Sequence, residues 1–123
     1  MSNFSVGFRA EAHIRILDLK GELDAHTVSE LEAALQRCRE DKNHHIIVNG
    51  EHLQYISSAG LGVFMAYIEE MREAGGDIKI AGLQANVFNI FDLLGFPLLF
   101  DIVKAEEEAI RKFDADRKDE NDS

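Results

Sequence analysis

Apolar positions along the chain switch between two periodicities, and the switches predict the elements. Residues 4–24, "FSVGFRAEAHIRILDLKGELD", carry short apolar runs that alternate imperfectly with polar residues, which is typical of strands. We expect two strands here, joined as a hairpin by a turn at residues 10–12. Gly21 is expected to end the second strand.

The next segment, residues 24–41, has the spacing of an amphipathic helix. Its apolar residues recur at intervals of three and four and share one face, namely Val28, Leu31, Leu35 and Cys38. Thr27 with Glu30 fits a capping box, and Asp24 is a competing N-cap. Either arrangement starts a helix in this region.

Strands and helices alternate through the rest of the chain. Strands are expected at 44–50, 77–83 and 98–103, and helices from Ser58 to Gly75, over 84–95 and over 105–113. The order ββαβαβαβα predicts an α/β fold with a mixed, largely parallel sheet of four to five strands. About four helices should lie mainly on one side of it. Residues 1–113 should form one domain, and the charged residues 114–123 a disordered tail.

The apolar stripes also predict the core. Its expected members are Val28, Leu31, Leu35, Ile46, Val48, Leu61, Phe64, Met65, Ile68, Met71, Ile80, Val87, Ile90, Phe91 and Leu94. Cys38, the single cysteine, is expected to be a small core residue rather than a reactive thiol.

Charge narrows the class of partner. The chain has 13 Lys and Arg against 23 Asp and Glu, a formal net charge of −10. Nucleic acid and anionic membrane surfaces would repel it, and no apolar run approaches the ~18 residues of a membrane span. With no secretion signal at its start, we expect a cytoplasmic protein.

Catalytic and metal-binding patterns are absent from the sequence. Ser57 and Ser58 do not lie in a Gly-x-Ser-x-Gly elbow, and "GLG" at 60–62 is only a fragment of a dinucleotide fingerprint. The adjacent His44 and His45 point to opposite faces of a strand and cannot converge on one metal. We therefore expect no enzyme, no cofactor and no metal.

One stretch, "YISSAGLGVF" at residues 55–64, is not explained by packing. A serine N-cap accounts for one of its two serines. The small residues Ala59, Gly60 and Gly62 would leave the start of the following helix uncovered, and an uncovered helix N-terminus attracts anions. One serine is therefore expected to be the N-cap residue of the helix, and the other, exposed serine to be a functional site that acts as a switch.

Two motifs in this order and spacing resemble a known family. "GELDAHT" at 21–27 and "ISSAGLGVF" at 56–64 look like the STAS domain of bacterial anti-sigma-factor antagonists, and "GGDIKIAGL" and "VFNIFDLLGF" match its later strand and helix. The resemblance covers roughly residues 4–113. It implies a binding module that captures a kinase-type anti-sigma factor and thereby frees the sigma factor.

The resemblance also implies a switch. The family motif reads Asp-Ser-Ser/Thr-Gly-Leu-Gly, which puts the serine phosphorylated by the partner kinase at Ser58. Two positions differ from the motif, since Ser57 replaces the acidic residue and Ala59 the second hydroxyl. Ser57 is thus a rival phosphorylation site. A phosphoserine phosphatase would reverse the modification, and the antagonist is expected to be a monomer.

The implied partner-binding residues are Asp24, His26, Thr27, Ser57, Ser58, Ala59 and Gly60, with Phe88 as a further contributor. Phe88 lies off the apolar stripe of its helix, although a core position is an equal alternative. The alternative function is a STAS scaffold subunit, either a lipid-transporter accessory or part of a stress-sensing assembly, because one fold serves several functions.

Overall fold

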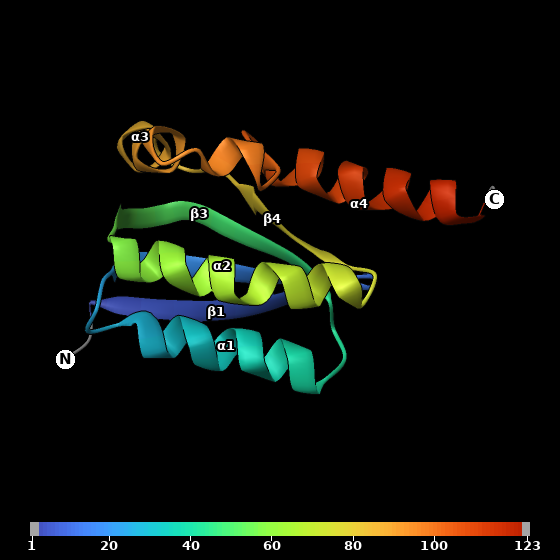
Figure 1. Ribbon diagram of the computed structural model, residues 1–123, viewed down its shortest axis with the longest axis horizontal. Helices are drawn as coiled ribbons and strands as arrows, with labels where there is room; N and C mark the ends of the chain where they lie inside the picture. Colours follow the sequence, from blue (N-terminus) through green and yellow to red (C-terminus); the bar gives the residue numbers. More distant parts are fainter. Residues whose placement is uncertain (1–2, 122–123) are drawn as a thin grey trace.

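The computed structural model describes the backbone of residues 3–121 and the side chains of residues 3–116. Figure 1 shows a sheet flanked by helices. The elements in chain order are β1 (Phe4–Glu11), β2 (Ile14–Leu23), α1 (Val28–Glu40), β3 (His45–Ile56), α2 (Ser58–Glu73), β4 (Asp77–Ala81), α3 (Ala85–Leu93), the short 3-10 helix η1 (Phe96–Leu98), β5 (Ile102–Val103) and α4 (Glu106–Asn121).

The sheet has five strands in the order β1-β2-β3-β4-β5. β1 and β2 pair antiparallel as a hairpin, and the other neighbours pair in parallel. The mixed sheet and the order ββαβαβαβα expected from the sequence are therefore confirmed. β2 continues to Leu23, beyond Gly21, which adopts a positive φ of 101° where a Cβ would collide with the carbonyl oxygen of Asn3. Gly21 is thus a bend within β2 and not its end.

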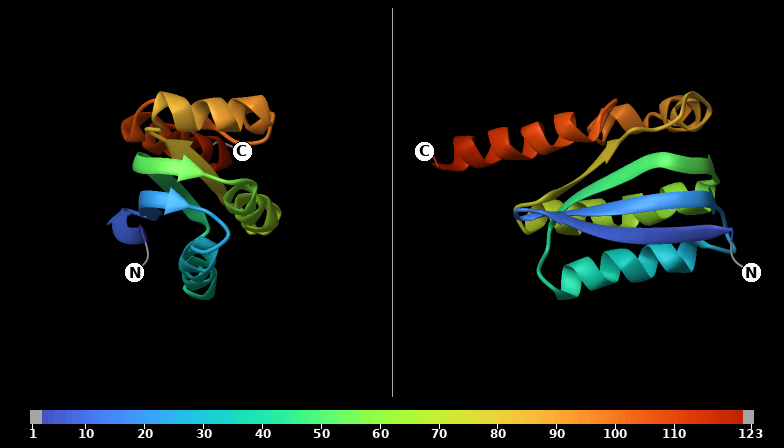
Figure 2. Two further views of the ribbon diagram at one scale, coloured as in Figure 1. Left: turned by 90° about the vertical axis from the view of Figure 1, so that its left-hand side faces the viewer. Right: turned by 180° about the vertical axis from the view of Figure 1, so that it is seen from behind.

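Both faces of the sheet are covered, which explains the imperfect alternation of residues 14–23. The larger apolar cluster takes Leu17, Leu19 and Leu23 from β2 and packs against α1, α2 and α3. The smaller cluster takes Ile14 and Ile16 and packs against α4. A strand buried on both faces reads as a nearly continuous apolar run. Figure 2 shows α1 and α2 on one side of the strands.

Most of the expected core is buried, with two errors. Leu94 is 57% exposed and Met65 is 45% exposed, and Val28 and Ile90 are only partly buried. α3 ends at Leu93, so Leu94 lies where the helical stripe no longer continues, just before Gly95 in the left-handed region. Met65 lies at the margin of the α2 stripe, whose buried face is formed by Gly60, Leu61, Val63, Phe64, Ile68 and Met71.

The C-terminal elements differ from the expected bounds. The strand expected over 98–103 is reduced to Ile102–Val103, because η1 occupies Phe96–Leu98 before it. The last helix does not end at residue 113 but continues to Asn121, so residues 114–121 are helical where a disordered tail was expected. The division of the chain into a domain over 1–113 and a tail stays a prediction.

Charged contacts tie α4 to the sheet. Arg9 donates hydrogen bonds to Asp18 of β2 and Glu106 of α4, and Asn49 donates to Glu106 at 2.9 Å. The hydrogen bond from Arg9 is the main cause that lowers the pKa of the Glu106 carboxyl. These contacts join the first turn of α4 to β1 and β3, and through Arg9 to β2.

A buried cation fixes the middle of the same helix. Lys79 of β4 is 2% exposed, and its ammonium lies 2.7 Å from Asp101, 3.0 Å from Asp77 and 3.6 Å from Asp116. Burial alone would lower the pKa of Lys79, but the hydrogen bonds that its ammonium donates to Asp101 and Asp77 raise it. The ammonium also lies 4.7 Å from the centre of the Phe113 ring. A buried charge is tolerated when it is paired in this way.

Within residues 3–121, none of the helices is both long enough and apolar enough to cross a bilayer.

Replacing leucines by alanine should distinguish buried core positions from exposed ones by the loss of stability. Leu35→Ala is expected to lower the free energy of unfolding by ~2–5 kcal/mol, because Leu35 is fully buried between α1 and the sheet. Leu98→Ala is the control, since Leu98 is 90% exposed and should change stability by less than about 0.5 kcal/mol. Urea unfolding measures both. Equal losses would contradict the packing described.

The Glu106 contacts should make stability depend on acid pH. Their stabilisation is complete above the ordinary glutamate pKa of about 4.3 and is lost as the pH falls through the lowered pKa of the folded state. Glu106→Gln should therefore cost about 1 kcal/mol at neutral pH and progressively less toward pH 3. Urea unfolding over a pH series measures this. Glu107→Gln, at an exposed position of the same turn, should not change the shape of the acid limb.

Candidate functional site

The loops after β2 and β3 meet at one end of the sheet. The two strands are parallel neighbours, with Leu23 opposite Ile56 at their ends. The backbone N–H of Ser57 donates to the carbonyl of Leu23 at 2.9 Å, which joins the loop over residues 24–27 to the start of α2. This end of the sheet is on the left in Figure 1. The two sequence motifs, far apart in the chain, therefore form one surface.

The two serines have different environments. Ser57 is the N-cap residue of α2, with an extended backbone, and its hydroxyl is buried with no hydrogen-bond partner among the described residues. The side-chain cap expected from the sequence is therefore not formed. Ser58 is the first residue of α2 and is exposed. Of the two hydroxyl-bearing residues, Ser58 is the one that a partner can reach.

Gly60 explains how α2 approaches the sheet so closely. A Cβ at this position would lie 2.8 Å from Leu23 Cγ and 2.9 Å from Ile56 Cγ1, closer than carbon atoms tolerate. The missing side chain lets the first turn of α2 rest directly on the ends of β2 and β3. Gly62, one half-turn later, is exposed and has no atom within 4 Å of a Cβ position. The two glycines of the motif thus have different roles.

The loop over residues 24–27 is held by its own side chains. Thr27 is buried, and its hydroxyl donates to the carbonyl of Glu22 and accepts from the N–H of Asp24, both at 2.9 Å. An Asp24 carboxylate oxygen accepts from the N–H of His26 at 2.8 Å. Thr27 stands at the N-cap of α1 without a side-chain cap bond, so neither expected capping arrangement is formed. Thr27 supports the loop, and His26 is exposed on it.

The start of α2 favours negative charge. Its first turn contains no acidic residue, whereas the first turn of α4 contains Glu106, Glu107 and Glu108. The N–H groups at a helix start carry a partial positive charge that attracts anions. The positive end of α2 is thus not neutralised by a carboxylate in its own first turn.

A shallow groove runs from this site between α1 and α2. Half-buried Ala59 lies at the end of the groove next to Ser58, and the exposed Gly62 and Ala66 of α2 line it further along. Arg39 of α1 and Glu70 of α2 form an ion pair of 3.4 Å across it, with Arg39 over the ring of Tyr67. Its lining residues are Val28, Glu32, Arg39, Ala59, Gly62, Val63, Ala66, Tyr67 and Glu70. This groove was not predicted from the sequence, although it could have been recognised from the i, i+3, i+7 spacing of Ala59, Gly62 and Ala66.

Phe88 is placed differently from the other expected residues. It is 36% exposed and lines a hollow with Leu83, Ile102 and Lys104 near β5. α3 reaches β3 through Asn86, whose amide donates to the carbonyl of Gln54 at 3.4 Å. Residues two apart on a helix point in nearly opposite directions, so Phe88 faces away from that contact. The structure does not bring Phe88 to the Ser58 surface.

The residues brought together are Asp24, His26, Thr27, Ser57, Ser58, Ala59 and Gly60. Among the described residues, no group of His, Cys, Asp or Glu is arranged to hold a metal ion. The surface offers one exposed hydroxyl at a helix start beside a fixed loop. Its chemistry suits binding and modification of that hydroxyl.

A family model described as "STAS domain" matches residues 8–109. The chain belongs to the STAS-domain family. It is also 32% identical over 87 residues to the "Anti-sigma-B factor antagonist" of Staphylococcus aureus strain NCTC 8325, a match that covers 71% of this chain and 81% of the relative. At this level of similarity the STAS protein is a member of the anti-sigma-factor-antagonist family, whose members are regulators and not enzymes.

Solved structures share the fold. The unphosphorylated anti-sigma factor antagonist SpoIIAA superposes with a TM-score of 0.77 at 23% identity, covering 90% of this chain and 97% of that one. The phosphorylated form of SpoIIAA from Bacillus gives 0.67 at 23% identity, covering 89% and 98%. The murine anion transporter Slc26a9 gives 0.73 at 13% identity, covering 87% of this chain and 18% of the transporter. These likenesses are to the fold alone.

The glycine pair gives a matched test of the site. Gly60→Ala should displace the start of α2 or lower stability by ~1–3 kcal/mol, because its Cβ collides with Leu23 and Ile56. Gly62→Ala should raise stability by about 0.5–1 kcal/mol, since alanine is the better helix former and space is open there. Thermal unfolding and amide chemical shifts at Ser58 report both. If Gly60→Ala were as stable as Gly62→Ala, the close approach of α2 would be wrong.

Proposed function

We propose that this STAS protein is an anti-sigma-factor antagonist switched by phosphorylation of Ser58. In its unmodified form it binds a kinase-type anti-sigma factor through Ser58, Ala59 and the loop with Asp24 and His26. Binding occupies the anti-sigma factor and frees the sigma factor. The observation that carries the proposal is the exposed Ser58 at the start of α2, at the serine position of the family motif.

The switch follows from phosphoryl transfer. The partner kinase moves the γ-phosphoryl group of ATP to the Ser58 hydroxyl oxygen, so an O–P bond forms, the bond to ADP breaks and the hydroxyl proton is lost. A phosphoserine phosphatase restores the hydroxyl by hydrolysis. The kinase step consumes ATP, and the phosphatase step consumes water and releases inorganic phosphate. The supply of ATP puts the protein in the cytoplasm in this proposal.

The fold should tolerate the phosphate, and the interface should not. A phosphate adds a charge of about −1.5 to −2, which the positive start of α2 accommodates without a carboxylate in the same turn. At a packed contact the same charge must lose its water and meet partner groups shaped for a neutral hydroxyl. A penalty of a few kcal/mol suffices, because each ~1.4 kcal/mol changes affinity tenfold.

The two serines differ in how accessible they are to a kinase. The Ser57 hydroxyl is buried, so a kinase could reach it only after a local rearrangement of the residues around it. Ser57 also replaces the acidic residue of the family motif, so the chain lacks a carboxylate that could orient the acceptor. We therefore propose Ser58 as the acceptor and expect its transfer rate to differ from that of relatives with the acidic residue.

Serine variants test the switch. Ser58→Ala should keep its stability, bind the kinase and resist release by ATP, because no acceptor is present. Ser57→Ala should still accept one phosphate. Ser58→Asp should fold normally and bind at least about tenfold more weakly. Phosphate is mapped by mass spectrometry after incubation with ATP and the candidate kinases.

Phosphorylation of Ser58→Ala at the rate of the unmodified sequence would move the switch to Ser57. Stable binding of a partner with no phosphorylation of either serine would instead favour a STAS scaffold function.

A further inference from the structure

In the part of the chain that the structure describes, the outer edge of β1 is open along its whole length. β1 is the first strand of the sheet, and no other strand of the described residues pairs with its outer side. Its eight residues pair with β2 without a register shift and contain no proline. An edge strand of this kind is a template for another strand unless it is blocked by a bulge, a proline or inward-pointing charges.

The residues that face outward can be identified from the ladder. The N–H of Glu22 donates to the carbonyl of Asn3, so Asn3 belongs to a hydrogen-bonded pair with β2. In an antiparallel ladder such pairs alternate, so Ser5, Gly7 and Arg9 also direct their backbone groups to β2. The intervening residues, Phe4, Val6, Phe8 and Ala10, direct their N–H and C=O groups to the open edge.

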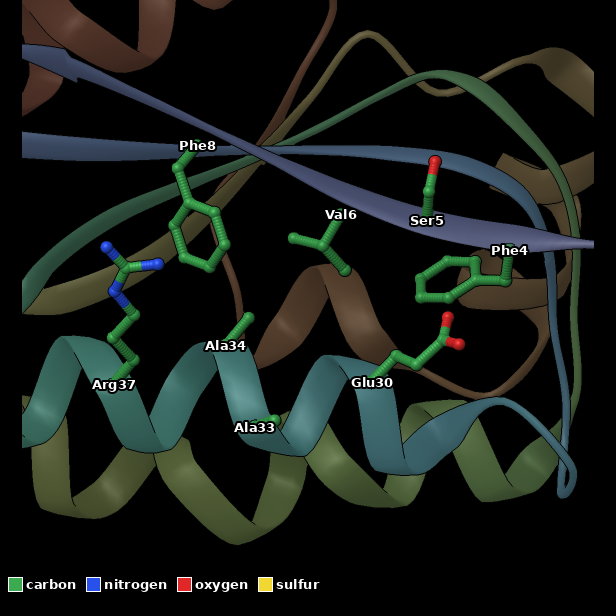
Figure 3. Close-up of a pocket in the computed structure, with 8 residues that line it drawn as sticks. All are labelled: Phe4, Ser5, Val6, Phe8, Glu30, Ala33, Ala34 and Arg37. Atoms are coloured by element: carbon green, nitrogen blue, oxygen red, sulfur yellow. The ribbon is translucent and has the colours of Figure 1, made fainter. Parts of the chain in front are cut away.

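An apolar groove accompanies this edge. Figure 3 shows Phe4, Val6 and Phe8 of β1 above Ala33 and Ala34 of α1. Phe8 is 44% exposed, and the alanines opposite are small enough to leave the groove open. A strand added at the edge would place alternate side chains into this groove.

The two ends of the groove carry opposite charges. Arg37 lies over the ring of Phe8, with its guanidinium carbon 4.7 Å from the ring centre. Glu30 lies beneath Phe4 at the other end (Figure 3). Phe4 and Glu30 are therefore at one end, Phe8 and Arg37 at the other, and Val6 is midway between them.

We propose that the groove and the β1 edge bind a second copy of this chain. Two β1 strands paired antiparallel, with Val6 opposite Val6 of the second copy, bring outward backbone groups together in each pair. The same two-fold arrangement sets Phe4 against Phe8 of the second copy. It also sets Glu30 of each copy against Arg37 of the other, so the surface is complementary to itself, as a two-fold interface requires.

Local charge permits this contact although the chain carries a net charge of −10. Arg15 joins Arg9 and Arg37 along the adjoining hollow at the end of the groove. Arg9 is already paired with Asp18 and Glu106, so Arg15 and Arg37 are the positive charges that offset Asp41 in this hollow. In this proposal a dimer takes the place of the monomer expected from the sequence, and Ser58, at the start of α2, lies outside the contact.

Charge reversal with rescue tests the dimer. Sedimentation of the full chain over a dilution series should give a species of about twice the chain mass of 13.8 kDa. Arg37→Glu alone, or Glu30→Arg alone, sets like charges against each other twice per dimer. Each should raise the dissociation constant roughly tenfold or more.

A mixture of the two single variants should form a mixed dimer with nearly the original dissociation constant, because both contacts are then between opposite charges. The double variant Glu30→Arg/Arg37→Glu should recover for the same reason. Recovery in the mixture also shows that each single variant is folded. Glu69→Arg, an exposed reversal on α2, is the control and should leave the dimer unchanged.

A species of single-chain mass at every concentration would overturn the proposal. A dimer that neither single reversal weakens would overturn it as well, because the contact would then lie elsewhere. Loss of the dimer without recovery in the mixture would contradict the two-fold register centred on Val6.

Discussion

The contact between the first turn of α2 and the ends of β2 and β3 is the constraint on which the site depends. Gly60 lets the helix rest against Leu23 and Ile56, and the Ser57 N–H bonds to the Leu23 carbonyl. Together they fix the direction in which α2 leaves the sheet. The Ser57 hydroxyl and Gly60 are buried, and Ser58 between them is exposed. The position of the hydroxyl is therefore set by backbone packing and not by its own hydrogen bonds.

The proposed switch at Ser58 is separate from the packing that stabilises the fold. The apolar cluster beneath α1, α2 and α3 is complete without Ser58, whose side chain lies outside it. The helix start can accept negative charge with no cost from acidic residues in its own turn. A modification at Ser58 then acts on what touches the surface. On the opposite face, the ion pairs of Arg9 and Lys79 hold α4 and are independent of the site.

The sequence predicts local features well and non-local ones poorly. The strand and helix order followed from periodicity. The residues of the two motifs lie together because their parallel strands end at the same edge of the sheet, and their binding of a partner stays a prediction. Leu94 was misplaced because its helix ends one residue earlier, a boundary that the apolar stripe does not mark. Lys79 in an apolar strand gave no sign of two of its partners, Asp101 and Asp116, because they come from later in the chain. The vacant cap at Ser57 depends on side-chain geometry that no pattern encodes.

The most direct test of the account compares this STAS protein with and without phosphate on Ser58. Affinity for a kinase-type anti-sigma factor and the thermal unfolding midpoint are measured on the same two samples. We expect an affinity at least about tenfold lower in the phosphorylated sample, with a midpoint shifted by no more than about 2–4 °C. Equal affinities would contradict it. A loss of affinity accompanied by unfolding of α2 would contradict it too, because the phosphate would then act on the fold and not on the interface.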